Sequence, residues 1–154
     1  MRYKVITTFK PGDWDRYARR MVQSVIDRWP DVDLTVYYEG QGPYFDHQRV
    51  TWVDIDKANP KLHKFREHYK NDPVAMGKLD EIPGGVRRSA RLATEGGLDA
   101  KKESYLWNAV KFSHKVSCVT HAVKTYTDYD YVIWIDDDTY TFRDIPMQFI
   151  ESIC

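Results

Sequence analysis

The first forty residues contain a strand, an amphipathic helix and a second strand in close succession. Residues 3–9 are β-branched and aromatic, which predicts a strand. Residues 14–29 carry an apolar stripe of helical period, with Asp13 placed to cap the helix and Pro30 to end it. Residues 33–38 predict a second strand. Because a strand–helix–strand unit of this length joins parallel strands, the chain is expected to form an α/β fold.

The middle of the chain is less regular. Residues 50–55 predict a third strand and residues 61–69 a short helix. Residues 71–102 contain many glycines and prolines, so a long, mobile excursion is expected there. Its arginines either form a solvated loop or close over an anionic ligand; they are Arg87, Arg88 and Arg91.

The last third returns to regular structure. A helix is predicted over 103–126, with a core-facing stripe made of Tyr105, Ala109, Phe112, Val116, Val119, Val123 and Tyr126. Residues 131–135 are apolar without interruption, which is typical of a central strand covered on both faces. The chain is therefore predicted to be one domain, residues 1–154, with a Rossmann-like, mainly parallel sheet sandwiched by helices.

Composition excludes several classes of protein. Of the 154 residues, 42% are apolar and 30% charged, and Lys plus Arg balance Asp plus Glu at 23 each. This balance argues against nucleic acid or an anionic membrane as the main partner. The sequence has no run of ~20 apolar residues, so no membrane span is expected. Cys118 and Cys154 form neither a metal spacing nor a disulfide framework, and a soluble, cytoplasmic protein is predicted.

Three adjacent carboxylates, Asp136, Asp137 and Asp138, directly follow the last predicted strand. Ligands of open α/β sheets bind beyond the carboxyl ends of the strands. In an extended segment Asp136 and Asp138 project to the same side, and Asp137 projects to the other. Two such carboxylates, completed by water and diphosphate oxygens, describe a Mg²⁺ or Mn²⁺ site. The alternative is an acidic turn in which Asp138 or Thr139 caps a helix.

Residues 134–146, WIDDDTYTFRDIP, resemble the DxD region of GT-A-type glycosyltransferases, notably the glycogenin and lipopolysaccharide-galactosyltransferase kinds. Residues 108–116 resemble the helix that carries a basic residue toward the donor diphosphate in these enzymes. They are also similar to a helix of uncharacterised bacterial and phage proteins of this group. The resemblance covers the first two strands and residues 105–150.

The resemblance implies a metal-dependent transferase that binds a nucleoside-diphosphate sugar, most simply a UDP-sugar. Asp136 would contact the ribose and the metal, and Asp138 would bind the metal directly. Lys115 would face the donor phosphates, with Lys111 as a substitute one turn earlier; for each lysine a solvated helix face is the alternative. The remaining implied donor-site residues lie at the ends of the first and second strands and are Thr7, Thr8, Phe9 and Glu39.

Transferases of this fold usually carry a further half after the metal motif, with the acceptor site and catalytic groups. This sequence has sixteen residues after Asp138, so only the donor-binding half is expected, and the catalytic residues and acceptor stay unassigned. A non-catalytic nucleotide-sugar-binding module is therefore one alternative. A haloacid-dehalogenase-type phosphatase is another, although it prefers threonine or valine where this chain has Tyr140. A P-loop is absent from the sequence, and the histidine spacings match no zinc motif.

Overall fold

The computed structural model describes residues 1–78 and 108–153. The chain divides into two compact units, one comprising Met1–Asn59 and Lys115–Cys154 and the other Pro60–His114. The first unit contains the whole of the described sheet.

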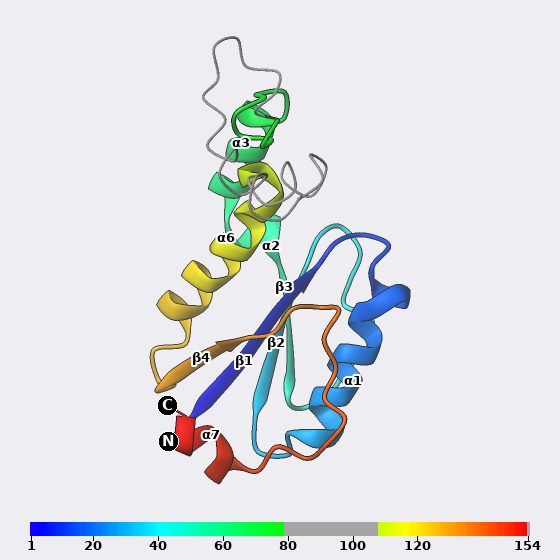
Figure 1. Cartoon of the computed structure of the whole chain (residues 1–154), viewed down its shortest axis with the longest axis vertical. Helices are drawn as coiled ribbons and strands as arrows, with labels where there is room; N and C mark the ends of the chain where they lie inside the picture. Colours follow the sequence, from blue (N-terminus) through cyan, green and yellow to red (C-terminus); the bar gives the residue numbers. More distant parts are fainter. Residues whose placement is uncertain (79–107, 154) are drawn as a thin grey trace, which may run out of the picture. The chain divides into compact units, whose positions relative to one another are not determined.

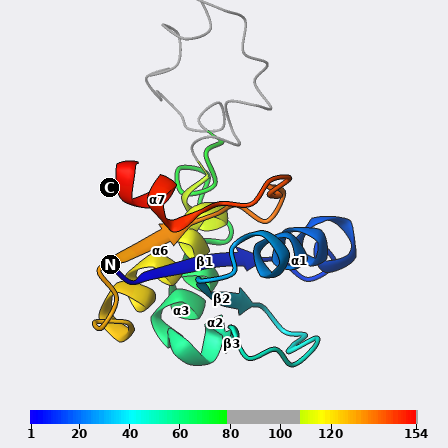
Figure 2. The same ribbon diagram turned by 90° about the horizontal axis from the view of Figure 1, so that it is seen from below.

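The sheet has four strands in the order β3-β2-β1-β4, and every neighbouring pair is parallel (Figures 1 and 2). The predicted parallel α/β arrangement is thereby confirmed, including the pairing of the first two strands. The strands are β1 (Tyr3–Phe9), β2 (Asp33–Tyr38), β3 (Val50–Asp54) and β4 (Tyr131–Trp134).

Helix α1 (Arg19–Arg28) covers one face of the sheet and builds the main core there. Alternate residues of β1 and β2 point toward it, because successive side chains of a strand face opposite sides. The buried cluster on this face includes Val5, Phe9, Leu34, Val36, Met21, Val22 and Val25. Burying a side chain of this size contributes about 1.5–3 kcal/mol, so this stripe accounts for much of the stability of the fold.

The predicted helix over 14–29 begins with a five-residue π-helix, η1 (Trp14–Ala18), before α1. Its wide turn shows in the bond from the Ala18 N–H to the Asp13 carbonyl, 3.1 Å, which spans five residues. Trp14 and Ala18 are buried, whereas Tyr17 of the predicted stripe is exposed. A π-turn holds more residues than an α-turn, which rotates Tyr17 out of the core.

The second face of the sheet contacts the later part of helix α6 (Ala109–Thr125). Figure 2 shows α1 and this part of α6 on opposite sides of the strands. Thr35 Oγ1 donates to the hydroxyl of Tyr126, which follows α6, at 3.1 Å, and the Tyr37 hydroxyl lies 2.9 Å from His121 Nδ1. This face is therefore more polar than the α1 face.

The predicted core-facing stripe of this helix is wrong for three of its members, because Ala109, Val116 and Val123 are exposed. Val116 and Val123 are 67% and 58% exposed, while Ser117, Cys118 and Ala122 are the buried residues. The apolar residues of helical period are mostly valines, but the helix turns smaller residues toward the sheet. Small side chains allow the helix backbone to lie close to the strands. Tyr105 lies outside the described residues.

The prediction of a central strand over 131–135 is also wrong. Within the described sheet β4 is an edge strand, and its residues are partly or largely exposed. The apolar run has a different cause: Ile133 and Ile135 pack against the α1-face core, and Tyr131 stacks on Tyr3 with ring centroids 5.5 Å apart. An edge strand can therefore be apolar on both faces when the side chains of each face pack against other residues.

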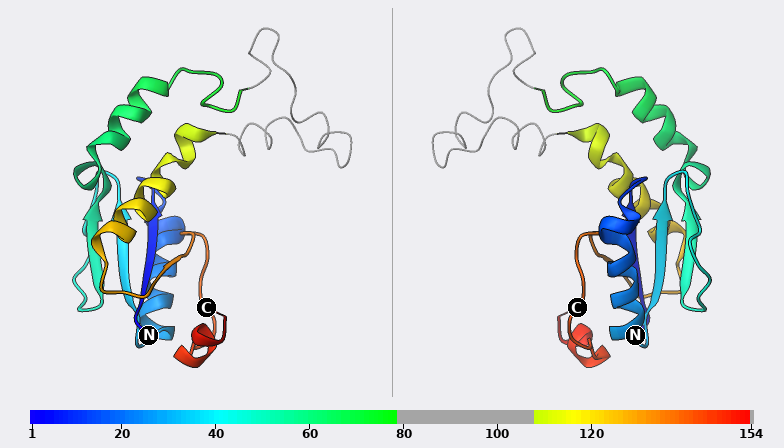
Figure 3. Two further views of the ribbon diagram at one scale, coloured as in Figure 1. Left: turned by 90° about the vertical axis from the view of Figure 1, so that its left-hand side faces the viewer. Right: turned by 90° about the vertical axis from the view of Figure 1, so that its right-hand side faces the viewer.

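Three further helices complete the described chain. They are α2 (Ile55–Ala58), α3 (Pro60–Tyr69) in the second unit, and α7 (Met147–Ile153), which buries Ile150 in the core. Figure 3 shows α7 and the amino terminus near the end at which β1 begins. The excursion predicted over 71–102 lies, from residue 79 on, outside the described residues, as do its three arginines. No helix within 1–78 or 108–153 is both long and apolar enough to cross a membrane.

Candidate functional site

The candidate site lies where the parallel strands end, because their carboxyl ends share one edge of the sheet. Ile6 of β1 is in register with Trp134 of β4, so Thr8 and Asp136 follow that pair at the same distance along their chains. Ile135 continues the ladder by donating its N–H to the Ile6 carbonyl at 3.0 Å. The three aspartates therefore begin where the ladder stops.

Lys115 and Asp136 form an ion pair, with Nζ and Oδ1 2.8 Å apart. The same carboxylate oxygen accepts a bond from Trp134 Nε1 at 2.7 Å, and the Lys115 ammonium lies 4.9 Å from the centre of the Trp134 ring. Both side chains of the ion pair are partly exposed, so the pair contributes little stability on its own. The arrangement brings one basic residue of α6 to the first carboxylate of the cluster.

Lys111 belongs to the second unit, whereas Lys115 belongs to the first with Asp136. The Lys111 backbone N–H donates to Asn108 Oδ1 at 2.7 Å, and the Lys111 ammonium lies 5.7 Å from the Phe112 ring centre. The predicted order of the two lysines stays a prediction, and Lys115 contacts the aspartate cluster through Asp136.

Asp137 is half-buried and has its pKa raised to about 6. Burial is the main cause, followed by the charge of Asp13, and then by those of Asp138 and Asp136. Asp13 occupies the N-cap position before η1 as predicted, but its side chain makes no capping hydrogen bond. The sequence pattern assigned Asp13 to a structural role and missed that the turn after β1 places it near the cluster.

Asp138 is exposed and lies, with Asp137, inside a turn that the Thr139 N–H closes by donating to the Asp136 carbonyl at 3.1 Å. Asp136 is exposed as well, while Asp137 is the more buried of the three. The backbone here forms a turn and not the extended segment for which the alternation was expected, so the opposite projection of Asp137 stays a prediction.

Thr7, Thr8 and Phe9, expected beside a nucleoside, are all buried in this structure. Phe9 packs in the aromatic part of the α1-face core, 5.5 Å between ring centres from Trp14. The Thr7 hydroxyl has no hydrogen-bond partner among the described residues, although most buried polar groups in proteins have one. None of the three lines the open pocket that the described residues form beside α1.

Glu39 follows β2 and is also buried. Its charge acts on Cys118 of α6, and Cys118 lies beside Thr8. Burial is the largest influence on this thiol and raises its pKa to about 12, so Cys118 is a protonated thiol at neutral pH. No sequence pattern points to Cys118, because a single cysteine within a helix has no distinguishing spacing.

The carboxylates have the oxygen chemistry that Mg²⁺ and Mn²⁺ prefer, and a cation would offset the repulsion between carboxylates that adds to the effect of burial on the pKa of Asp137. In the described part of the chain no group of three or more His, Cys, Asp or Glu side chains is arranged around a metal position. The residues therefore fit a site of two carboxylates whose remaining ligands come from water and a diphosphate, and do not fit a closed protein cage.

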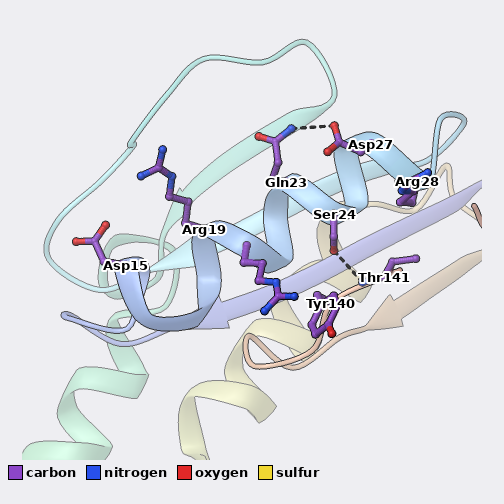
Figure 4. A pocket seen from close by; sticks show the side chains of 9 residues that line it. Asp15, Arg19, Gln23, Ser24, Asp27, Arg28, Tyr140 and Thr141 are labelled. Carbon is purple, nitrogen blue, oxygen red and sulfur yellow. Dashed lines mark hydrogen bonds between the residues drawn. The ribbon is translucent and has the colours of Figure 1, made fainter. Parts of the chain in front are cut away.

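An open pocket lies along the outer side of α1 and the segment 140–141 (Figure 4). Its charged side chains include Asp15, Arg19 and Asp27, which Figure 4 shows spread along the helix and not pointing at a common centre. Binding sites typically place a few polar groups so that they converge. The strand ends, and not this pocket, are the better candidate for chemistry.

Comparison with protein-family models, with curated proteins and with solved structures gave no match.

Proposed function

We propose that this chain binds a nucleoside-diphosphate sugar and a divalent cation as the donor-binding part of a metal-dependent glycosyltransferase. The observation that carries the proposal is the contact between Lys115 and Asp136. It joins the basic residue that the resemblance to GT-A-type enzymes places first at the donor diphosphate, with Lys111 as its substitute, to the first carboxylate of the expected metal site.

The sheet supports the proposal in a general way. Its strands are all parallel, and the aspartates follow β4 at the edge where open α/β sheets bind ligands. The haloacid-dehalogenase alternative shares this topology, but the segment after its second aspartate would need a small hydroxyl or branched residue. Here Tyr140 occupies that position and lies against Arg20, 3.7 Å between the guanidinium carbon and the ring centre.

The residues of the site would divide the work as follows. Asp136 and Asp138 would hold the Mn²⁺ or Mg²⁺, whose positive charge would stabilise the diphosphate leaving group. Trp134 Nε1 holds the Asp136 carboxylate in a fixed orientation. Lys115 keeps that carboxylate neutralised before the donor binds, and its ammonium would then turn to phosphate oxygens. Thr7, Thr8, Phe9 and Glu39 would need to become accessible for the nucleoside to reach them.

The test combines binding with turnover. Isothermal titration of the protein with UDP, in the presence and absence of Mn²⁺, should give metal-dependent binding, because the phosphate oxygens complete the cation's shell. Release of UDP from UDP-sugars would then separate an enzyme from a binding module. Failure of UDP to bind with either cation would remove the basis of the proposal, and phosphate release from an aryl phosphate would favour the phosphatase instead.

A further inference from the structure

The segment that leaves the aspartate cluster runs back along α1, as Figure 1 shows for the orange loop beside the blue helix. Two contacts at its far end are a bond from the Ile145 N–H to the Arg28 carbonyl, 2.8 Å, and an ion pair between Arg28 and Asp144, 2.9 Å. The ion pair is largely exposed and so contributes little. The stronger attachment lies closer to the cluster, at Thr141.

Thr141 is held at two points by residues of α1 and its end. Its N–H donates to Ser24 Oγ at 2.9 Å, and its own Oγ1 accepts a bond from Trp29 Nε1 at 2.8 Å. Figure 4 shows Ser24 and Thr141 facing each other across the first of these bonds. Both bonds are partly buried, which protects them from competition with water.

The Ser24 hydroxyl is oriented for this contact by a hydrogen bond within its own helix. Its hydroxyl proton is donated to the Met21 carbonyl at 2.7 Å, which leaves its oxygen lone pairs available to the Thr141 N–H. Trp29 is itself fixed, since its ring is buried in the α1-face core. The two contacts are therefore made by rigid partners.

The aspartates lie between two fixed points of backbone. On one side the Ile135 N–H is bonded to Ile6, and on the other the Thr141 N–H is bonded to Ser24. Adjacent carboxylates repel each other and favour spreading of the segment, so the anchor that follows them restrains their position. A site for a small cation needs its oxygens held within about 0.5 Å of the productive geometry.

We propose that Ser24 and Trp29 are positioning residues: through Thr141 they hold the Asp136–Asp138 segment in the geometry that binds the cation. The metal-binding part of this inference rests on the proposed function, whereas the restraint of the segment does not. The ligand concerned is a divalent cation with oxygen ligands, and the positioning residues do not touch it.

The test uses Ser24→Ala, with Ser152→Ala as the matched control. Ser152 Oγ donates to the Phe149 carbonyl at 2.7 Å, so it makes the same bond to its own helix, and it has no counterpart of Thr141. Amide hydrogen exchange of the metal-free protein should accelerate at Thr139 and Thr141 in Ser24→Ala and not in Ser152→Ala. Mn²⁺ titration followed by electron paramagnetic resonance should show about three- to tenfold weaker binding in Ser24→Ala alone, as for one lost hydrogen bond.

Ser24→Thr, which keeps the hydroxyl, should restore both properties. A merely structural role for Ser24 would lower the melting temperature without changing exchange at Thr139 selectively or the Mn²⁺ affinity, and that result would overturn the inference. If the wild-type protein binds no Mn²⁺, the proposed function fails, and exchange at Thr139 alone decides the restraint: an unchanged rate would overturn it, and a selective increase would support it.

Discussion

Lys115 Nζ lies 2.8 Å from Asp136 Oδ1, and Trp134 Nε1 lies 2.7 Å from the same oxygen. One carboxylate oxygen thus links helix α6 to the end of strand β4. The Lys115 ammonium also lies over the Trp134 ring, 4.9 Å from its centre. Lys115, Trp134 and Asp136 are therefore all in contact with one another. In this arrangement the Lys115 ammonium neutralises the carboxylate that a metal ion would neutralise in the proposed complex.

Replacing Lys115 by alanine tests what this ammonium does. If it contacts the donor diphosphate, Lys115→Ala should weaken UDP binding by ~1–3 kcal/mol, as for a lost charge-assisted hydrogen bond. Stability should change by less than about 1 kcal/mol, because the ion pair is partly exposed. Lys124→Ala on the same helix is the control for charge alone. Equal UDP affinity in both variants would return Lys115 to a solvated-face role, and would make Lys111 the next residue to test.

The orientation of α6 gives a second prediction. Ala122 is fully buried and its neighbour Val123 is 58% exposed. Ala122→Leu should therefore lower the free energy of unfolding by about 1–3 kcal/mol through overpacking. Val123→Ser should change it by no more than about 0.5 kcal/mol, as for other surface positions. Urea unfolding of both variants measures this, and the opposite ranking would mean that the valine stripe faces the sheet in solution.

The comparison of α6 with α1 explains what the sequence can predict in this fold. On α1 the buried positions are large and apolar, such as Met21, Val22 and Val25, so the helical period is visible. On α6 the buried positions are Ser117, Cys118 and Ala122, which have no hydrophobic signal strong enough to outweigh the exposed valines. The existence of both helices was predictable, but the buried face of α6 was not.

The candidate site shows a similar division. Asp136–Asp138 could be placed at a strand end, because an apolar run followed by carboxylates is visible in one stretch of sequence. Asp13 and Ser24 could not be assigned, since their relation to the cluster depends on a turn after β1 and on the packing of α1 beside residues 139–145. Contacts between segments far apart in the chain leave no pattern in the sequence, so they can be identified only once the tertiary fold is known.

The raised pKa of Asp137 predicts how stability depends on pH. The folded protein holds a proton on this group up to about pH 6, whereas the unfolded chain releases it near the ordinary value of 3.8. Between these values the native state binds more protons, so the contribution of Asp137 makes the protein less stable as pH rises. The penalty is absent below the unfolded pKa and complete above about pH 6.

Asp137→Asn should consequently stabilise the metal-free protein at pH 7 and have little effect at pH 4. The measurement is the difference in free energy of unfolding between wild type and variant across this range, with Asp31→Asn as a control for an exposed carboxylate. Asp13→Asn should move the midpoint of the difference to lower pH, since the charge of Asp13 contributes to the shift. A difference that does not vary with pH would show that Asp137 is not crowded in solution.

Divalent cations test the cluster as a whole. Mn²⁺ should raise the melting temperature, because a ligand that binds only the native state stabilises it by mass action. At a free concentration about a hundredfold above Kd the stabilisation is about 2.7 kcal/mol, which corresponds to roughly 5–10 °C for a chain of this size. UDP should enlarge the shift, because its phosphate oxygens complete a shell that two aspartates leave open.

The two exposed aspartates should differ from Asp137 in this experiment. Asp138→Asn should abolish the Mn²⁺ shift while keeping the fold, since this exposed carboxylate is the expected direct ligand. Asp137→Asn should retain most of the shift, because its side chain is half-buried and near Asp13 instead. Thermal scans of both variants with and without Mn²⁺ and UDP provide the comparison. If the two variants respond alike, or if Mn²⁺ with UDP shifts neither wild type nor variants, the cluster is an acidic turn at the end of β4 and the metal-dependent function is wrong.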